Sequence, residues 1–306
     1  MDFSGMTISG GVSIVPPPPP SGIRAIFGYG NGGTDLSITN LVSTTGVVAT
    51  DTTGVGTARR VLAAAGYGTD KSIFGYGSVG GVAQSMTNLV SNTGVVGNDV
   101  TGVGTNRSHL AAAGYGGDKA IVGYGSSGAP SYLALSMTNL VSNTGIVGND
   151  VTGVAPTRIL LAAAGYGGDK AIFGYGLGGT GFNLVSNTGV VAANTAGVGT
   201  DRRGLAATGY GSSGEAIFGY GTTGSDVSMT NLVSNTGVVA TDTTGVGTAR
   251  NNLAAAGYGS SGQAIFGYGS GPSSMTNLVS NTGVVATDTT GVGTAREGLA
   301  AASYGS

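Results

Sequence analysis

The side chains best suited to chemistry in this chain are six arginines that recur at a regular interval. In each repeat but one an aspartate stands eight positions before the arginine, and Asn194 takes its place in the exception. Six guanidinium groups brought together could hold an anion. The regular aspartate favours local pairing instead, in which each arginine bonds its own carboxylate or nearby carbonyls and fixes a loop. The two series are Arg59, Arg107, Arg158, Arg202, Arg250 and Arg296, and Asp51, Asp99, Asp150, Asp242 and Asp288.

Metal and cofactor chemistry has little support in the sequence. Calcium favours several carboxylate and carbonyl oxygens, and one aspartate per repeat is too few. An aspartate in a threonine-rich turn more often caps its own backbone. We therefore expect no metal and no cofactor.

Catalysis is also poorly supported. His109 is the only histidine and there is no cysteine, so a Ser-His-Asp triad, a thiol nucleophile and a copper site that needs several histidines cannot be assembled. Near-identical repeats argue against an active site, because catalysis needs different groups that converge at one place. We predict that the protein is not an enzyme, although a glycan-processing enzyme remains an alternative.

Composition limits the partners that the chain can have. The net charge is -2 and only 12 basic and 14 acidic side chains are present in 306 residues, so neither a nucleic-acid footprint nor a basic membrane patch is expected. Residues 171–200 carry no charge, but Gly, Asn, Thr and Ser interrupt them too often for a membrane span. Nucleic acid and membrane insertion are therefore not expected.

The arginines belong to a larger repeat. Between Ile26 and Tyr304 a block of roughly 48 residues occurs six times, and such a block is too small to bury a core alone. Stability must therefore come from each block stacking against its neighbours. A second series counts the same six blocks: Tyr29, Tyr76, Tyr124, Tyr175, Tyr220 and Tyr268.

Each block contains the pattern of four short strands, as residues 71–116 illustrate. The segments 73–76 and 86–90 are short, apolar or alternating and bounded by turn residues. The sequence 91–94, Ser-Asn-Thr-Gly, suits a tight hairpin that leads to a third strand at Val95 and Val96. The fourth, residues 110–115, is mostly alanine and glycine, which suits a strand crowded near a central axis.

Two phrases in each block resemble the kelch family. The glycine-rich "IFGYG" is similar to the kelch strand that ends in two glycines, and "TAR" before "LAAA" is similar to the arginine-led strand that begins a kelch blade. The resemblance implies an all-β fold, a six-bladed β-propeller with four antiparallel strands per blade. It also implies that residues 299–304 complete the blade that begins at residues 25–30 and so close the ring. A β-solenoid or a trimeric fibrous shaft is the competing fold.

The amino-terminal residues read as a separate region. Residues 1–15 form a leader, residues 16–23 contain five consecutive prolines and form an extended spacer, and residues 24–306 form the propeller. The leader has apolar residues separated by small polar ones, a pattern able to add a strand to another protein's sheet. We expect it to anchor the protein through Phe3, Met6, Ile8, Val12, Ile14 and Val15.

Longer phrases resemble a second group of proteins. "LVSNTGVVATDTTGVGTAR" and "LAAAGYGGDKAIFGYG" are similar to repeats in glycine-rich fibre and appendage proteins of marine tailed bacteriophages. This resemblance implies a non-enzymatic structural protein of the virion, made in the host cytoplasm, that joins other virion proteins through its leader. A kelch-type adaptor for protein interactions is the alternative.

A candidate ligand face follows from the loops. The segments after each "GYG" vary most in length and sequence, and we expect them to share a face with the "TTGVGTAR" connections. The exposed aromatic and apolar groups of the longest loop could contact a host surface glycan. The candidate residues are Asp35, Pro130, Tyr132, Leu133 and Asp226.

Overall fold

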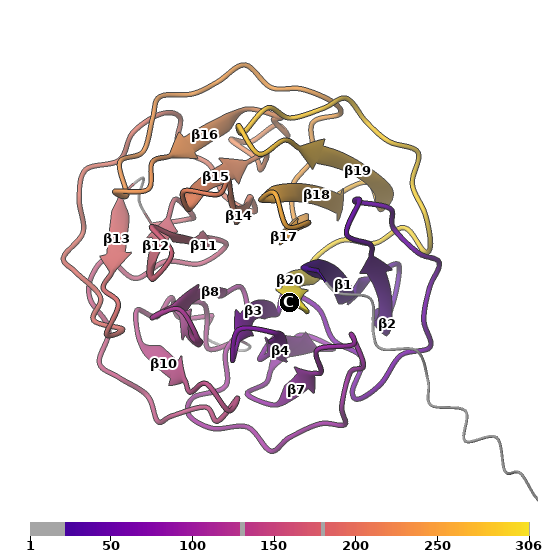
Figure 1. The fold of residues 1–306 in the computed structure, drawn as a ribbon. Coiled ribbons are helices and arrows are strands. Elements are labelled where there is room, and N and C mark those ends of the chain that lie inside the picture. Colours follow the sequence, from indigo (N-terminus) through magenta and orange to yellow (C-terminus); the bar gives the residue numbers. More distant parts are fainter. Residues whose placement is uncertain (1–21, 129–131, 179–180, 306) are drawn as a thin grey trace, which may run out of the picture.

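The computed structural model describes residues 22–128, 132–178 and 181–305, and within them the chain is all-β. It contains six antiparallel sheets of three strands and one sheet of two short strands, β5 (Ser78–Val79) and β6 (Val82–Ala83). Figure 1 shows the six sheets arranged around a common centre, in the order of the sequence. The anchoring leader, most of the proline spacer and Pro130 lie outside the described residues.

The strand nearest the centre of each sheet ends in tyrosine and otherwise consists of alanine and glycine, except for Thr208 and Ser303. Small side chains let these strands approach one another closely, and each contacts the inner strand of both neighbouring sheets. The six inner strands are β3 (Ala63–Tyr67), β8 (Ala111–Tyr115), β11 (Ala162–Tyr166), β14 (Ala206–Tyr210), β17 (Ala254–Tyr258) and β20 (Ala300–Tyr304).

The middle strand of each sheet holds the large apolar side chains. Each middle strand pairs with an inner strand on one side and an outer strand on the other. The middle strands are β1 (Arg24–Asn31), β4 (Lys71–Gly75), β9 (Lys119–Gly123), β12 (Lys170–Gly174), β15 (Glu215–Gly219) and β18 (Gln263–Gly269). The outer strands are β2 (Asp35–Val42), β7 (Thr87–Val90), β10 (Thr138–Val141), β13 (Phe182–Val185), β16 (Thr230–Val233) and β19 (Ser273–Val279).

The third strand that the sequence predicts in each block, at Val95 and Val96 in the second, does not form. In the second sheet the segment after the hairpin meets β7 only at two isolated bridges, Val90 with Val96 and Thr87 with Val100. Between these bridges the carbonyl of Gly97 accepts a hydrogen bond from the side chain of Asn88, 3.0 Å away. The ladder is interrupted because a side chain takes a position that a paired backbone N–H would otherwise occupy.

The last strand pairs with the first, as the sequence predicts. β20 is antiparallel to β1, with Ala302 opposite Ile26 and Tyr304 opposite Arg24. The first sheet therefore combines residues from both ends of the repeat region. The contact makes the first sheet equal in strand number to the other five.

A cycle of backbone hydrogen bonds joins all six sheets just before their inner strands. Each of six residues donates its N–H to the carbonyl of its counterpart in the neighbouring sheet, and the sixth bond returns to the first residue, at N···O distances from 2.6 to 3.0 Å. All six have a positive φ between 48° and 63°. They are Val61, His109, Leu160, Gly204, Asn252 and Gly298.

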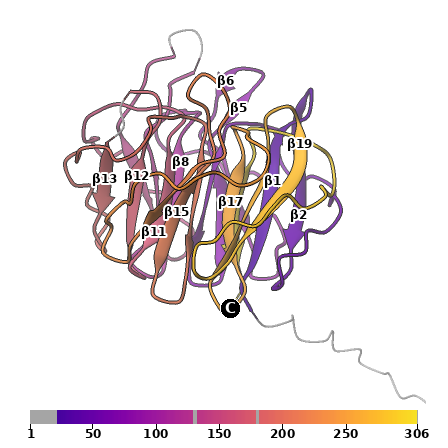
Figure 2. The same ribbon diagram turned by 90° about the horizontal axis from the view of Figure 1, so that it is seen from above.

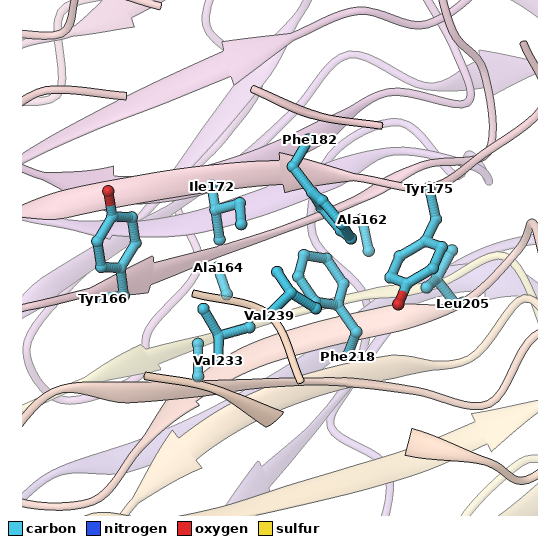
Figure 3. Packing of buried hydrophobic residues seen from close by; sticks show 11 residues of the cluster. Ala162, Ala164, Tyr166, Ile172, Tyr175, Phe182, Leu205, Phe218, Val233 and Val239 are labelled. Atoms are coloured by element: carbon cyan, nitrogen blue, oxygen red, sulfur yellow. The ribbon is translucent and has the colours of Figure 1, made fainter. Parts of the chain in front are cut away.

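The core lies between neighbouring sheets, as the small size of each block predicts. Figure 3 shows one of six such clusters, in which Tyr175 and Ile172 of one sheet pack against Phe218 and Val233 of the next. Five middle strands contribute a phenylalanine that packs on the tyrosine of the preceding sheet with ring centroids 5.1 to 5.3 Å apart, and Val122 takes this place in β9. Each sheet is thus buried by its two neighbours.

The ends of the strands define two faces, which Figure 2 shows from the side. The loop face carries the variable segments that follow "GYG", including β5 and β6, together with the connections that lead to the arginines. Bridges such as Arg60 with Ser78 and Arg203 with Thr222 pair these two kinds of segment, so the expectation that they share a face is confirmed. The turn face carries the tight turns between inner and middle strands, and the last described residue, Gly305, lies there.

Removal of residues 299–306 should destabilise the whole protein. The deletion takes away β20, exposes the edge of β1 and removes the buried side chains of Leu299 and Tyr304. We expect a loss of several kcal/mol, a large share of a typical ~5–15 kcal/mol stability. Thermal unfolding measures it, with deletion of Ser306 alone as the control. A truncated protein with an unchanged melting temperature would show that β20 contributes nothing to stability.

Candidate functional site

The six recurring arginines lie between neighbouring sheets, and none of them faces the centre. Their relative exposure is 0 to 2%, although arginine is almost never fully buried unless paired. The passage at the centre is lined instead by the alanines and glycines of the inner strands. The alternative in which the six guanidinium groups come together and hold an anion is therefore wrong. The side chains turn away from the axis into the interfaces between neighbouring sheets, which we call seams, as a structural role requires.

Arg59 shows how the guanidinium is held in four of the six seams. Arg107 and Arg158 bond through Nη1 and Nη2 instead, and their Nε atoms have no partner among the described residues. The Cζ of Arg59 lies 4.3 Å from the ring centroid of Tyr29 in the preceding sheet. In its own sheet Nε donates to the carbonyl of Tyr76 at 2.8 Å and Nη2 donates to Oδ1 of Asn88 at 2.7 Å. The flat face of the guanidinium therefore contacts the preceding sheet, while its N–H donors, which lie in its plane, bond the sheet to which Arg59 belongs.

The same arrangement joins residues from the two ends of the chain. The guanidinium of Arg296 lies 4.2 Å from the ring centroid of Tyr268 in the last sheet. It donates to the carbonyl of Tyr29 at 2.8 Å and to Oδ1 of Asn40 at 2.7 Å in the first sheet. The seam between the last and first sheets thus has the chemistry of the seams within the chain.

Of the two kinds of partner expected for each arginine, the nearby carbonyl is found, as where Nη1 of Arg59 donates to the carbonyl of Thr57 at 3.1 Å, but the aspartate eight residues before it is not. Arg59 lies 3.9 Å from Asp99, which follows it by forty residues, while Asp51 accepts hydrogen bonds from the backbone and hydroxyl of Thr294. The aspartate sits in the outer segment of the sheet whose inner strand the arginine precedes. The spacing in the sequence predicts the wrong partner, because the inner strand of a sheet belongs to one block and its outer strand belongs to the next.

The aspartates do not cap their own turns either. Asp99 accepts from the N–H of Thr57 at 2.9 Å and from its hydroxyl at 2.6 Å, and from Nδ2 of Asn88 at 2.9 Å. Thr57 is forty-two residues away in the chain. Each aspartate therefore ties the outer segment of a sheet to the loop before its inner strand.

One sheet lacks this hydrogen-bonded link between the aspartate and the threonine. Both residues are replaced there, and the loss of the donor accounts for the loss of the acceptor. Pro156 stands where the other blocks have the donating threonine, and Asn194 stands where they have the aspartate. Proline has no N–H and no hydroxyl to donate, so a carboxylate opposite it would have no partner from that residue. Arg158 in this block still bonds the side chain of Asn183 and the carbonyl of Gly181.

The recurring tyrosines hold a strained backbone conformation. All six have φ between 59° and 65°, where bulky residues are rarely found. The hydroxyl of Tyr220 donates to the carbonyl of Val246 at 3.1 Å, and the equivalent bond recurs in the other blocks. Burial raises the pKa of Tyr220 to about 12, against the lowering effect of Arg250, so the phenol stays neutral and able to donate.

The sequence did not lead us to expect the buried asparagines, whose side chains bond the arginine and the aspartate at the seam. Asn88 accepts from the arginine through Oδ1 and donates through Nδ2 to Gly97 and Asp99, so all three of these contacts depend on one amide. Asparagine is present at this position in every block, and that recurrence was the available signal. The series is Asn40, Asn88, Asn139, Asn183, Asn231 and Asn277, each with a relative exposure of 0%.

Two of the predicted ligand residues are used inside the structure. Asp35 forms an ion pair with Arg60 at 3.3 Å and accepts from the N–H of Gly80 at 2.9 Å. Asp226 accepts hydrogen bonds from Asn251 and Ser270 of the next sheet. Both carboxylates therefore tie neighbouring parts of the loop face together.

The remaining candidates are exposed or outside the described residues. Tyr132 is 56% exposed and Leu133 62% exposed, and both lie on the loop face, whereas Pro130 is outside the described residues. A Cβ placed on Gly81 would lie 4.0 Å from the hydroxyl of Tyr132, so the ring reaches towards the β5–β6 hairpin. Tyr132 and Leu133 are the predicted ligand residues whose side chains are available to a partner.

The histidine takes part in the fold. His109 belongs to the backbone cycle, and its Nδ1 lies 3.1 Å from the hydroxyl of Ser108. Burial, with a smaller effect from the charge of Arg60, lowers its pKa. In the part of the chain that the structure describes, no three His, Cys, Asp or Glu side chains lie together as metal ligands would.

The sequence matches no model of a known protein family and no curated protein. Over the described ranges the chain forms no helix that could cross a membrane.

Replacement of a seam arginine should be far more damaging than replacement of its neighbour. Arg59→Met leaves Tyr76 and Asn88 without their buried donor, and we expect a loss of about 2–4 kcal/mol. Arg60→Met removes a side chain that is 40% exposed, and a loss below about 1 kcal/mol is expected. Denaturant unfolding of the two variants measures the difference. Equal losses would contradict a special role for the seam.

The aspartates should make stability fall in acid. Burial alone would raise the pKa of Asp288, but hydrogen bonds from Thr248 and Asn277 outweigh it and hold the pKa below its ordinary value of 3.8. A carboxyl whose pKa is lower in the folded protein stabilises it above the ordinary pKa and loses this effect as pH falls through the folded value. Stability should therefore fall below about pH 4.

Asp288→Asn isolates this contribution. We expect the variant to be less stable than the parent at pH 7 and the difference to shrink as pH falls below about 4. Melting temperatures across that range measure it. A difference that stays constant with pH would show that the Asp288 carboxylate gives no pH-dependent stabilisation.

Proposed function

We propose that this chain is a non-enzymatic structural protein of a bacteriophage particle. In this proposal its body is a closed six-bladed, kelch-like β-propeller that displays its loop face, and that face contacts a glycan on the host surface. The leader, residues 1–15, joins the protein to other virion proteins. The proposal is based on the resemblance of the long repeated phrases to phage proteins and on the contacts between the sheets.

The propeller part is supported by the contacts between the ends of the repeat region. β20 pairs with β1, and Arg296 joins the first and last sheets through Tyr268, Tyr29 and Asn40. A propeller explains both, because each blade then meets a neighbour on either side. It also explains why the six backbone hydrogen bonds before the inner strands return to their starting residue.

The observation that carries the structural role is the use of the recurring polar residues. The arginines, tyrosines and asparagines that repeat in all six blocks are buried in the seams and bonded to one another. These residues recur because every seam needs them, and they make the body rigid. Since all six seams are alike, they form no site that is specific to one block. A rigid, repetitive body of low charge suits display on a particle.

The loop face is where the blocks differ. The second block has the extra β5–β6 hairpin, the third has the longest segment with Tyr132 exposed, and the sixth has a short turn after β18. Faces that vary on a constant scaffold are where repeat proteins place their binding surfaces. An exposed tyrosine can pack on the apolar face of a sugar with little loss of side-chain entropy.

Removal of residues 1–15 should abolish incorporation into particles and leave the body folded. The repeats begin after the proline run, and every described seam lies beyond it. Mass spectrometry of purified particles measures incorporation, and thermal unfolding of the isolated protein provides the folding control. Normal copy number with the truncated protein would exclude the leader as the anchor.

Tyr132→Ala should reduce adsorption of particles to host cells. The matched control is Val190→Ser, which alters a side chain that is 66% exposed beside a hairpin tip on the turn face. Loss of one aromatic contact is expected to weaken glycan binding by about 0.5–1.5 kcal/mol per site. Equal adsorption by the two particles, with both proteins folded, would remove the loop face as the glycan-binding surface.

A further inference from the structure

A groove of about 190 Å³ lies between the outer parts of the last and the first sheet. One wall is the hairpin that follows β2, with Thr45, Val47 and Val48. The other wall is formed by β19 and the segment after it. The residues on that wall are Thr276, Leu278, Thr289, Thr290 and Val292. The groove is a feature of the fold and does not depend on the function proposed above.

The groove offers apolar surface and hydroxyl groups together. Val48 and Leu278 are partly buried against the core between the two sheets, and Val47 stands beside them with 65% of its surface exposed. Over the described ranges, no hydrogen bond joins the hydroxyl of Thr289 or Thr290 to another residue. Because a hydroxyl can donate one hydrogen bond, the groove suits an apolar segment that is rich in acceptors.

A proline run has this chemistry. Its rings are apolar, and its backbone carries carbonyl acceptors and no N–H donor. Its extended polyproline II form is already ordered, so docking costs little conformational entropy. The chain contains such a run at residues 16–20, which ends two residues before Gly22.

The described part of the chain starts beside this groove. Gly22 lies against Thr44 of the same hairpin, where a Cβ on the glycine would be 2.9 Å from Cγ2 of the threonine. The carbonyl of Ile23 accepts a hydrogen bond from the N–H of Gly259 in the last sheet at 2.9 Å. The chain therefore enters the first sheet where that sheet contacts the last one. The tether gives the preceding prolines a high effective concentration at the groove.

The hairpin of the first sheet differs from the others where it meets the incoming chain. Thr44 stands where the other five hairpins have asparagine. In the third sheet this asparagine, Asn143, donates to Asp118 in the turn between β8 and β9 at 3.1 Å. The first sheet has no such turn, because β20 and β1 come from opposite ends of the repeat region. Gly22 contacts the hairpin there instead, which fixes the start of the preceding segment beside the groove.

We propose that residues 16–20 dock in this groove of their own chain. The proline rings pack on Val47 and Leu278, and the proline carbonyls accept hydrogen bonds from Thr289 and Thr290. The docked prolines act as a strap between the hairpin of the first sheet and the segment that leads into β20. Within the first sheet β20 and β1 are held together by hydrogen bonds alone, so the strap supports this contact. It also fixes the direction in which residues 1–15 leave the body.

Disulfide trapping in the full chain tests the proposal, because the sequence contains no cysteine. Pro18→Cys is combined with Thr290→Cys in the groove or, as the control, with Thr53→Cys at the equivalent position of the first sheet. In a glutathione buffer we expect the pair in the groove to form its disulfide at least ~10-fold faster. Replacement of the other four prolines by serine should remove this preference. Equal rates for the two pairs exclude the groove, and disulfide-linked dimers would show that the prolines bind a second copy instead.

Thermal unfolding of the full chain provides a second test with a matched control. Val47→Ser removes an apolar contact with the strap, whereas Val95→Ser changes the equivalent residue of the second hairpin, which is also 65% exposed. We expect Val47→Ser to lower the melting temperature by about 2 °C more than Val95→Ser. The excess should vanish when residues 16–20 are replaced by glycine and serine. An equal effect of the two substitutions, or an excess that persists without the prolines, would contradict the strap.

Discussion

The buried guanidinium between neighbouring sheets is the interaction on which the rest of the structure depends. A three-stranded sheet with an alanine and glycine inner strand cannot bury its own faces, so each sheet is stable only against its neighbours. Arg250 stacks on Tyr220 of one sheet and donates to Tyr268 and Asn277 of the next. A desolvated charge is stable there because its donors are bonded and its face is covered.

The seam also explains the strained tyrosines. A bulky residue at positive φ costs about 1–3 kcal/mol, and six blocks repeat it. In β1 and β18 the pairing register shifts at this residue, between Gly28 and Gly30 and between Gly267 and Gly269. The shifted backbone turns the tyrosine carbonyl to the arginine Nε and the ring under the next arginine. The contacts of the seam thus offset the local strain.

Much of the fold was predictable from the sequence, because the repeat carries it. Six units, the hairpin positions, packing between units and the pairing of the last strand with the first all follow from recurring apolar and turn residues. The third strand of each block was predicted wrongly, since the pattern of Val95 and Val96 could not reveal that the Asn88 side chain takes the carbonyl of Gly97. Local periodicity predicts which segments are extended, and side-chain competition decides which of them form a ladder.

The candidate site was harder to predict. The arginines and aspartates were recognised, yet their partners lie about forty residues apart, because one sheet draws its inner and outer strands from different blocks. The loss of the aspartate at Asn194 becomes intelligible only when Pro156 is seen to be its would-be partner. Asp35 and Asp226 were predicted to contact a ligand, but their carboxylates bond other residues of the loop face. The sequence alone does not distinguish these two roles.

A pair of double-mutant cycles tests the central claim that the seam between the chain ends is equivalent to the seams within it. One cycle combines Arg250→Met with Asn277→Ala, and the other combines Arg296→Met with Asn40→Ala, which have matching hydrogen bonds of 2.6 and 2.7 Å. Buried charged hydrogen bonds of this kind predict a coupling energy of about 1.5–3 kcal/mol in both cycles. Coupling within the chain but none between Arg296 and Asn40 would contradict the account.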